Sequence, residues 1–174
     1  MIARGGTGPG PRAVAAALVC LVWLAAGCDG GTSSPERPPT PVMNVREMTV
    51  RATPTPVDLD GRPGPDGLAV LVNLFGAQGD QPTTVRGRLE FALYEGLLEA
   101  GDFGQARPLR SWSFAGEELE PFLMRDLFGW GYRLPLAWGE SPPRTSAATL
   151  TASYVPPSGR AVSAKPLGIA LRPR

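Results

Sequence analysis

Apolar and polar residues alternate with a period of two along much of the chain beyond residue 42. In VRGRLEFALYE, residues 85–95, Val85, Leu89, Phe91 and Leu93 fall on one side, and arginine and glutamate residues fall on the other. Successive side chains of a strand point to opposite faces, so this pattern predicts a strand with one buried and one solvated face. Similar runs, the last interrupted by a proline, predict further strands over residues 45–52, 109–114, 149–155 and 161–171.

Two other segments depart from simple alternation. GLAVLVNLF is apolar at nearly every position from Leu68 to Phe75, which is typical of a central strand covered on both faces. GYRLPLAW, residues 131–138, places its aromatic residues and leucines on one face and Pro135 on the other. Because proline has no N–H to donate to a neighbouring strand, we predict that this strand lies at the edge of a sheet.

One segment favours a helix. In EELEPFLMRDLF, residues 117–128, apolar residues recur at helical spacing on one side: Leu119, Phe122, Leu123 and Leu127. Pro121 is compatible with a helix only in the first turn, so we expect one or two turns. About seven strands, at most one short helix and no regular strand–helix alternation predict an all-β domain over residues 42–174. The expected architecture is a two-sheet antiparallel β-sandwich of immunoglobulin-like or transthyretin-like kind.

The first 28 residues have a different pattern. Arg4 and Arg12 are the only charged residues before Asp29, and residues 13–27 (AVAAALVCLVWLAAG) are apolar throughout. A helix of that length spans only about 22 Å, which is less than the roughly 30 Å hydrocarbon core of a bilayer. A basic start, a short apolar middle and small residues at its end indicate a secretory signal peptide rather than a retained transmembrane helix.

The end of this segment resembles the lipobox of bacterial lipoproteins. Leu24, Ala25, Ala26 and Gly27 precede Cys28, although Leu, Val or Ile is commoner than alanine at the position of Ala25. The resemblance implies that residues 1–27 are a signal peptide removed just before Cys28. It also implies that the Cys28 thiol carries a diacylglyceryl group and that its amine carries a further acyl chain such as palmitate. The protein is then exported from the cytoplasm and lipid-anchored to a bacterial membrane in the cell envelope.

The whole region after the cysteine resembles small uncharacterised β-sandwich lipoproteins, a resemblance that implies no activity. Aspartate at position 29 is similar to the signal that retains lipoproteins of enteric-type bacteria in the inner membrane. Residues 28–41 comprise the lipidated cysteine and a tether rich in Gly, Ser, Thr and Pro. At about 3.1 Å per residue for proline-rich chain, the stretch from Asp29 to Pro41 could hold a domain up to roughly 40 Å from the bilayer.

Composition excludes several kinds of chemistry. The chain has no histidine, and Cys28 is its last cysteine, which removes Ser-His-Asp and Cys-His catalysis and the metal sites built on these residues. We expect no cofactor. With 17 Lys and Arg against 16 Asp and Glu, the chain offers no basic surface for nucleic acid. A carboxylate-dependent hydrolase needs two acidic groups across a cleft, but the sequence singles out no pair, so no catalytic residue is assigned.

Two features are candidates for binding. In the loop DLDGRPGPDG, Asp58, Asp60 and Asp66 could offer oxygens to calcium. The loop lacks the third aspartate and the final glutamate of an EF-hand loop, and its Asp-Gly and Pro-Gly pairs indicate solvated turns, so we expect no metal site. Trp130 lies between two glycines and is the tryptophan expected on the surface, whereas the tryptophans of the alternating strands are expected in the core.

These observations favour a membrane-anchored binding or structural module of the cell envelope over an enzyme. Its expected partners are the membrane, through Cys28, and a protein or carbohydrate of the envelope. A calcium-stabilised carbohydrate- or peptide-binding domain is the first alternative. A carboxylate-dependent hydrolase is the second.

Overall fold

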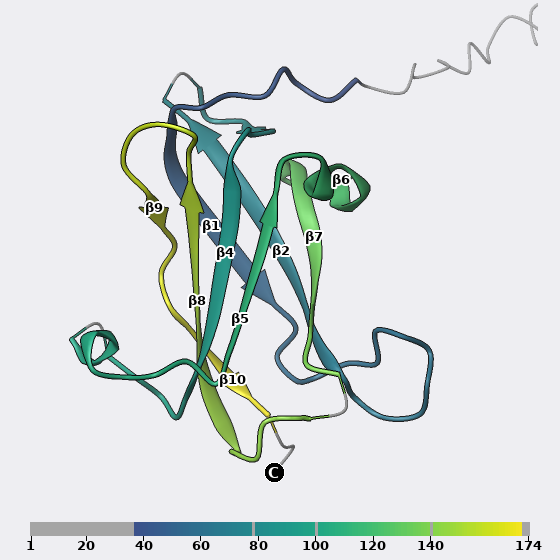
Figure 1. The fold of residues 1–174 in the computed structure, drawn as a ribbon. Helices are drawn as coiled ribbons and strands as arrows, with labels where there is room; N and C mark the ends of the chain where they lie inside the picture. Colours follow the sequence, from purple (N-terminus) through teal and green to yellow (C-terminus); the bar gives the residue numbers. More distant parts are fainter. Residues whose placement is uncertain (1–36, 78, 100, 140, 172–174) are drawn as a thin grey trace, which may run out of the picture. The chain divides into compact units, whose positions relative to one another are not determined.

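The computed structural model describes residues 37–77, 79–99, 101–139 and 141–171. The predicted signal peptide, Cys28 and most of the predicted tether lie outside these residues. From Pro38 onwards, two antiparallel sheets pack face to face (Figure 1). The prediction of an all-β, two-sheet sandwich is confirmed.

The first sheet has the strand order β1-β2-β7-β6. Its strands are β1 (Val45–Ala52), β2 (Gly67–Gly76), β6 (Leu123–Asp126) and β7 (Gly129–Ala137). A two-residue strand, β3 (Pro82–Thr83), pairs with the end of β2. Val72 of β2 lies opposite Val50 of β1 on one side and Tyr132 of β7 on the other, so β2 is central.

The second sheet has the order β10-β8-β4-β5. Its strands are β4 (Arg88–Glu95), β5 (Arg110–Ala115), β8 (Ala147–Val155) and β10 (Leu167–Ala170), with β9 (Val162–Ser163) paired to β8. The segment predicted as one strand over 161–171 is thus two short strands, because Pro166 between them has no N–H to donate. Central β4 places Leu89 between Phe114 and Tyr154.

Alternate residues of these strands form the core between the sheets. Leu89, Phe91 and Leu93 are at most 2% exposed, as their alternation predicted. They belong to one hydrophobic cluster with the inward residues of the other long strands, which include Leu68, Val70, Val72, Leu74, Leu134, Leu136, Leu150, Ala152 and Tyr154. Removing this apolar surface from water is the main force that holds the two sheets together.

Two buried tyrosines hold the chain where it passes from the first sheet to the second. The Val85 N–H donates to the Tyr132 hydroxyl oxygen at 3.0 Å, and the Tyr154 hydroxyl donates to the Arg86 carbonyl. Gly87 follows with φ of +133°, and a Cβ there would lie 2.5 Å from the Val155 carbonyl oxygen. Only glycine fits this backbone and this space.

β7 is not the outermost strand of its sheet, as Pro135 led us to expect. β6 pairs only with the Gly129–Tyr132 half of β7, and the other half has β2 as its one neighbouring strand among the described residues. The Trp138 N–H donates to the Asp66 carbonyl beside β2, at 2.9 Å. The Pro135 nitrogen, an odd number of residues away, therefore points to the open edge. The proline marks a locally open edge, although the strand itself is internal.

Residues 117–128 are helical only in their first half. η2 (Gly116–Phe122) is a 3-10 helix, and β6 follows it directly. Pro121 explains the early end, because a proline in the interior of an α-helix clashes with the preceding turn. Leu119 is buried as expected, whereas Leu127 is fully exposed in the β6–β7 turn. The one other helical segment that is described is a single turn, η1 (Asp102–Gly104).

Candidate binding surface

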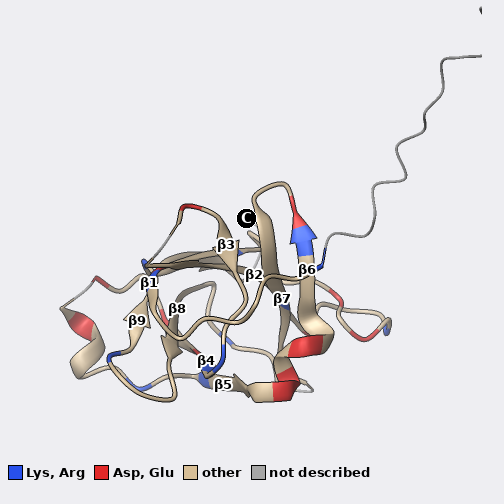
Figure 2. Ribbon diagram, turned by 90° about the horizontal axis from the view of Figure 1, so that it is seen from above, with Lys and Arg blue, Asp and Glu red and all other residues tan. Residues whose placement is uncertain are grey.

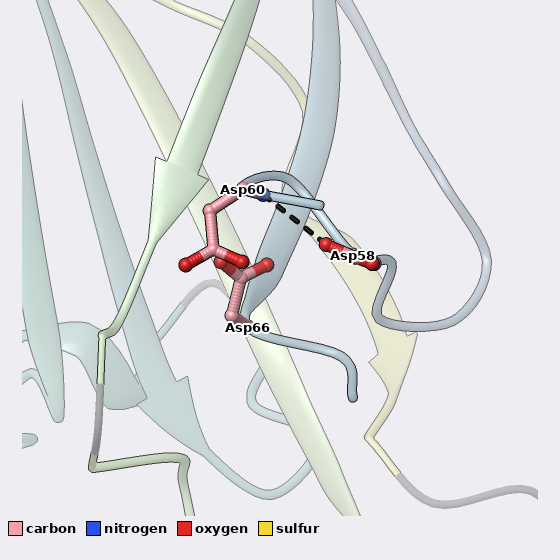
Figure 3. Close-up of side chains that lie close together, drawn as sticks. All are labelled: Asp58, Asp60 and Asp66. Atoms are coloured by element: carbon pink, nitrogen blue, oxygen red, sulfur yellow. Dashed lines mark hydrogen bonds between the residues drawn. The ribbon is translucent and has the colours of Figure 1, made fainter. Parts of the chain in front are cut away.

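Asp58, Asp60 and Asp66 come together in the loop between β1 and β2. One carboxylate oxygen from each lies within 4.8 Å of the others. Figure 3 shows the Asp60 and Asp66 carboxylates side by side, with Asp58 next to the Asp60 backbone. Asp58 and Asp60 are exposed and Asp66 is half-buried. The structure thus brings together the three residues that the sequence suggested.

Backbone N–H groups of the loop already use one oxygen of each carboxylate. Asp58 Oδ1 accepts from the N–H groups two and three residues later, at 3.2 and 2.7 Å. Asp60 Oδ1 accepts from the N–H two residues later, at 2.9 Å, and Asp66 Oδ1 accepts from the Leu59 N–H at 2.7 Å. Calcium takes six to eight oxygens, and these three residues supply only part of such a set. The contacts give the carboxylates a role in shaping the loop.

A shallow groove of about 400 Å³ lies on the outer face of the second sheet. The outward-facing side chains of three adjacent strands line it: Glu90 and Tyr94 of β4, Ser111 and Ser113 of β5, and Thr151 and Ser153 of β8. These are the polar positions of the alternating pattern. Hydroxyl groups both donate and accept hydrogen bonds, and a tyrosine ring offers a face for stacking. The groove is therefore suited to a polar ligand such as a sugar.

Two contacts orient the charged and aromatic side chains of this groove. The Arg88 Nε lies 2.8 Å from Glu90 Oε1, and both side chains are about half exposed, at 50% and 42%. An ion pair this exposed contributes little stability, so its main effect is to direct the carboxylate. The Tyr94 ring packs edge-on against Phe103 of η1, with ring centres 5.3 Å apart. The connection between β4 and β5 thus positions one wall of the groove.

Trp112 also lines the groove, and the other described tryptophans lie elsewhere. Trp112 is half-buried, and its Nε1 donates to the Ala137 carbonyl at 2.7 Å, which links β5 to the open edge of β7 across the sandwich. Trp138 is buried, as expected. Trp130 is not the exposed side chain that its glycine neighbours suggested, because it is half-buried and its Nε1 is enclosed with no hydrogen-bond partner among the described residues. Tyr94, which no sequence pattern singled out, is the outward-facing aromatic residue of the groove, which Phe91 and Trp112 also line.

A polar cluster that no sequence pattern indicated lies on the outer face of the first sheet. Asn73 is 2% exposed in the middle of β2. Arg51 Nη2 lies 2.8 Å from Asn73 Oδ1 and 2.6 Å from Asp126 Oδ2, and the guanidinium carbon lies 4.3 Å from the centre of the Phe128 ring. The available signal was Asn73 itself, the one polar residue in the apolar run. Its partners come from distant strands, which spacing along the chain cannot reveal.

Two tyrosines have perturbed pKa values. Burial raises the pKa of Tyr132 above its ordinary 10.0, the Glu120 charge adds to the increase, and the hydrogen bond from Val85 opposes it. Burial is also the main cause that raises the pKa of Tyr154. Both hydroxyls hold the crossing between the sheets, and neither side chain lines the groove. Their perturbation follows from structural roles.

Cys28, the predicted lipid attachment site, lies outside the described residues. Within the part of the chain that is described, no helix is both long enough and apolar enough to cross a bilayer. No family model, curated protein or solved structure matches the chain.

Proposed function

We propose that this protein is a lipid-anchored module of the bacterial cell envelope that binds a carbohydrate and is not an enzyme. The observation that carries the proposal is the hydroxyl-lined groove with Tyr94 on the outer face of β4, β5 and β8. This face belongs to a folded unit that starts at Pro38, a short distance along the chain from Cys28.

The anchor is the lipid proposed at Cys28. Each buried methylene contributes roughly 0.8 kcal/mol to membrane binding, and two or more chains give a stable attachment where one does not. The Thr84 hydroxyl donates to the Pro39 carbonyl at 2.7 Å, so the fold already holds the end of the predicted tether. This contact supports a linker that is somewhat shorter than residues 28–41.

The ligand proposed for the groove is a sugar of the envelope. Ser111, Ser113, Thr151 and Ser153 offer hydroxyls that match the hydroxyls of a sugar, and Tyr94 offers a stacking surface. Asp58, Asp60 and Asp66 lie in a different loop, at the end where β1 finishes and β2 begins. The proposed binding therefore does not depend on calcium.

Labelling with a radioactive fatty acid tests the anchor. We expect cells that make the wild-type protein, or the Cys20→Ser variant, to incorporate palmitate into the chain. The Cys28→Ser variant should incorporate none, because it lacks the acceptor thiol. Label retained by Cys28→Ser, or missing from the wild type, would contradict the proposal.

Blocking the groove tests the ligand. Ser113 of β5 and Ser163 of β9 are both exposed serines of the second sheet, but only Ser113 lines the groove. Ser113→Arg should abolish co-sedimentation of the detergent-purified protein with insoluble cell-wall glycan, whereas Ser163→Arg should retain it. Equal binding by the two variants, or no binding by the wild type, would show that the groove is not a carbohydrate site.

A further inference from the structure

The β6–β7 turn exposes two large apolar side chains in succession. Leu127 is 100% exposed and Phe128 is 62% exposed, and Met43, which precedes β1, is 53% exposed. Tight turns generally carry small or polar residues, and adjacent exposed apolar side chains form the kind of patch that marks an interaction site. The adjacent Leu127 and Phe128 therefore indicate a surface that contacts another molecule or a membrane in the cell.

These residues lie at the end of the sandwich where the chain enters from its N-terminal segment. A Cβ on Gly129, directly after the turn, would lie 3.1 Å from the Pro82 ring. Thr84, two residues beyond Pro82, holds the Pro39 carbonyl. The described chain begins at this end (Figure 1), and the view onto it shows the β6–β7 turn projecting beyond the strands of the sheet (Figure 2).

The turn is held in place by the polar cluster on the first sheet. The Phe128 N–H donates to Asp126 Oδ1 at 2.8 Å, and Asp126 Oδ2 accepts a hydrogen bond from Arg51 Nη2 at 2.6 Å. The same guanidinium lies over one face of the Phe128 ring. The exposure of Leu127 is therefore imposed by fixed contacts.

We infer that Leu127, Phe128 and Met43 contact the surface of the bilayer that holds the lipid of Cys28. The inference rests on the proposed anchor. A tether that reaches no farther than roughly 40 Å keeps this end of the domain near the membrane. Tethering raises the effective concentration into the millimolar range, so a weak apolar contact is enough.

Charge does not provide the attraction. Basic and acidic segments both lie at this end (Figure 2), and Arg46 pairs with Asp80 at 3.5 Å. An anionic bilayer is therefore not needed, and the contact depends on the apolar side chains. Leu97, in the connection between β4 and β5 at the opposite end, is 72% exposed and provides a matched control.

The test uses the lipidated protein purified from membranes and reconstituted into phosphatidylcholine vesicles. Leu127→Cys and Leu97→Cys each introduce one free thiol for an environment-sensitive fluorophore, because Cys28 is blocked and Cys20 has been removed. We expect the emission of the fluorophore at position 127 to shift to the blue and to be quenched by lipids with brominated acyl chains. The fluorophore at position 97 should show neither effect.

The outcomes separate this inference from the anchor. If Cys28 of the wild-type protein accepts the fluorophore and the protein does not stay with the vesicles, the proposed anchor fails. If the protein stays with the vesicles but the fluorophore at position 127 behaves like that at position 97, the bilayer contact is overturned. A blue shift without quenching by brominated lipid would also overturn it, and would show that a second copy or another protein covers Leu127.

Discussion

β2 and β4 are interior strands of the two sheets, and their outward faces differ. Both strands bury every inward apolar residue. On β4 the outward Glu90, Ala92 and Tyr94 are half-buried and line an open groove. On β2 the outward Asn73 is 2% exposed beneath Arg51, whose guanidinium also reaches Asp126.

The difference shows what a continuous apolar run indicates. The run in β2 predicted a strand covered on both faces, but the cover on the second face is partial, since Ala69, Leu71 and Phe75 are half-buried. Side chains of neighbouring strands provide the cover. Strict alternation, as in β4, leaves polar side chains on the second face, and this is the face for which we propose carbohydrate binding.

Truncating a buried side chain of β4 should have the largest effect on stability. Phe91 is 2% exposed and packs edge-on against Phe114, with ring centres 6.2 Å apart. We expect Phe91→Ala to lower the free energy of unfolding by about 3–5 kcal/mol through lost burial and the cavity left behind. Glu90→Ala, on the groove face of the same strand, should change it by about 0.5 kcal/mol or less. Urea unfolding of the two variants makes the comparison, and similar losses would mean that β4 does not have one buried face.

The hydrogen bond that links the β2 side of the sandwich to the start of β4 should have the second-largest effect on stability. Tyr132 lies opposite Val72 of β2, and its hydroxyl accepts the Val85 N–H just before β4. Tyr132→Phe leaves that buried N–H without a partner, which should cost roughly 1–3 kcal/mol of unfolding free energy. Chemical unfolding at neutral pH measures it. An unchanged midpoint would show that this hydrogen bond does not secure the crossing.

The same tyrosine gives a pH dependence. Its folded pKa is raised above 10.0, so the neutral phenol is favoured in the folded state. The stability that it contributes is therefore complete below pH 10 and is lost as the pH rises through the folded pKa. Unfolding midpoints should fall above pH 10 in the wild type and fall less steeply in Tyr132→Phe. Parallel curves for the two proteins would exclude Tyr132 as a source of the alkaline loss.

The side chains that cover the outward face of β2 should contribute less to the free energy of unfolding than the residues of its buried face. Arg51→Ala removes a donor to the buried Asn73 and the partner of Asp126, and we expect a loss of roughly 1–2 kcal/mol. Arg46→Ala on the same strand is the control, because Arg46 pairs with Asp80 at 3.5 Å where both side chains are largely exposed, at 54% and 98%. If thermal or urea unfolding shows equal, small effects for the two variants, the second face of β2 is as open as that of β4.

Adding calcium should have the smallest effect of all, because we expect no tight binding to the protein. The Asp58, Asp60 and Asp66 oxygens supply only part of a calcium shell, and backbone N–H groups use one oxygen of each. Calorimetric titration of the purified protein should show no binding tighter than about 1 mM. Micromolar binding that is lost in Asp60→Ala would establish a metal site.

Sequence patterns predicted local features better than contacts between strands. The buried faces of β4 and β8 follow from alternation alone, as does the location of the polar groove residues on the opposite faces. The helical spacing of residues 117–128 predicted a helix that is only partly formed. Pro121 ends the helix early, and β6 then pairs with β7. The Arg51–Asn73–Asp126 cluster joins residues on three separate strands, so no local signal specifies it.

Mass spectrometry of the N-terminus of the membrane-extracted protein tests the central claim, lipid anchoring at Cys28, most directly. We predict an N-terminal peptide that begins at Cys28 and carries a diacylglyceryl group, with a further acyl chain on its amine. An N-terminal peptide with an unmodified Cys28, or cleavage well away from the Gly27–Cys28 bond, would contradict the account.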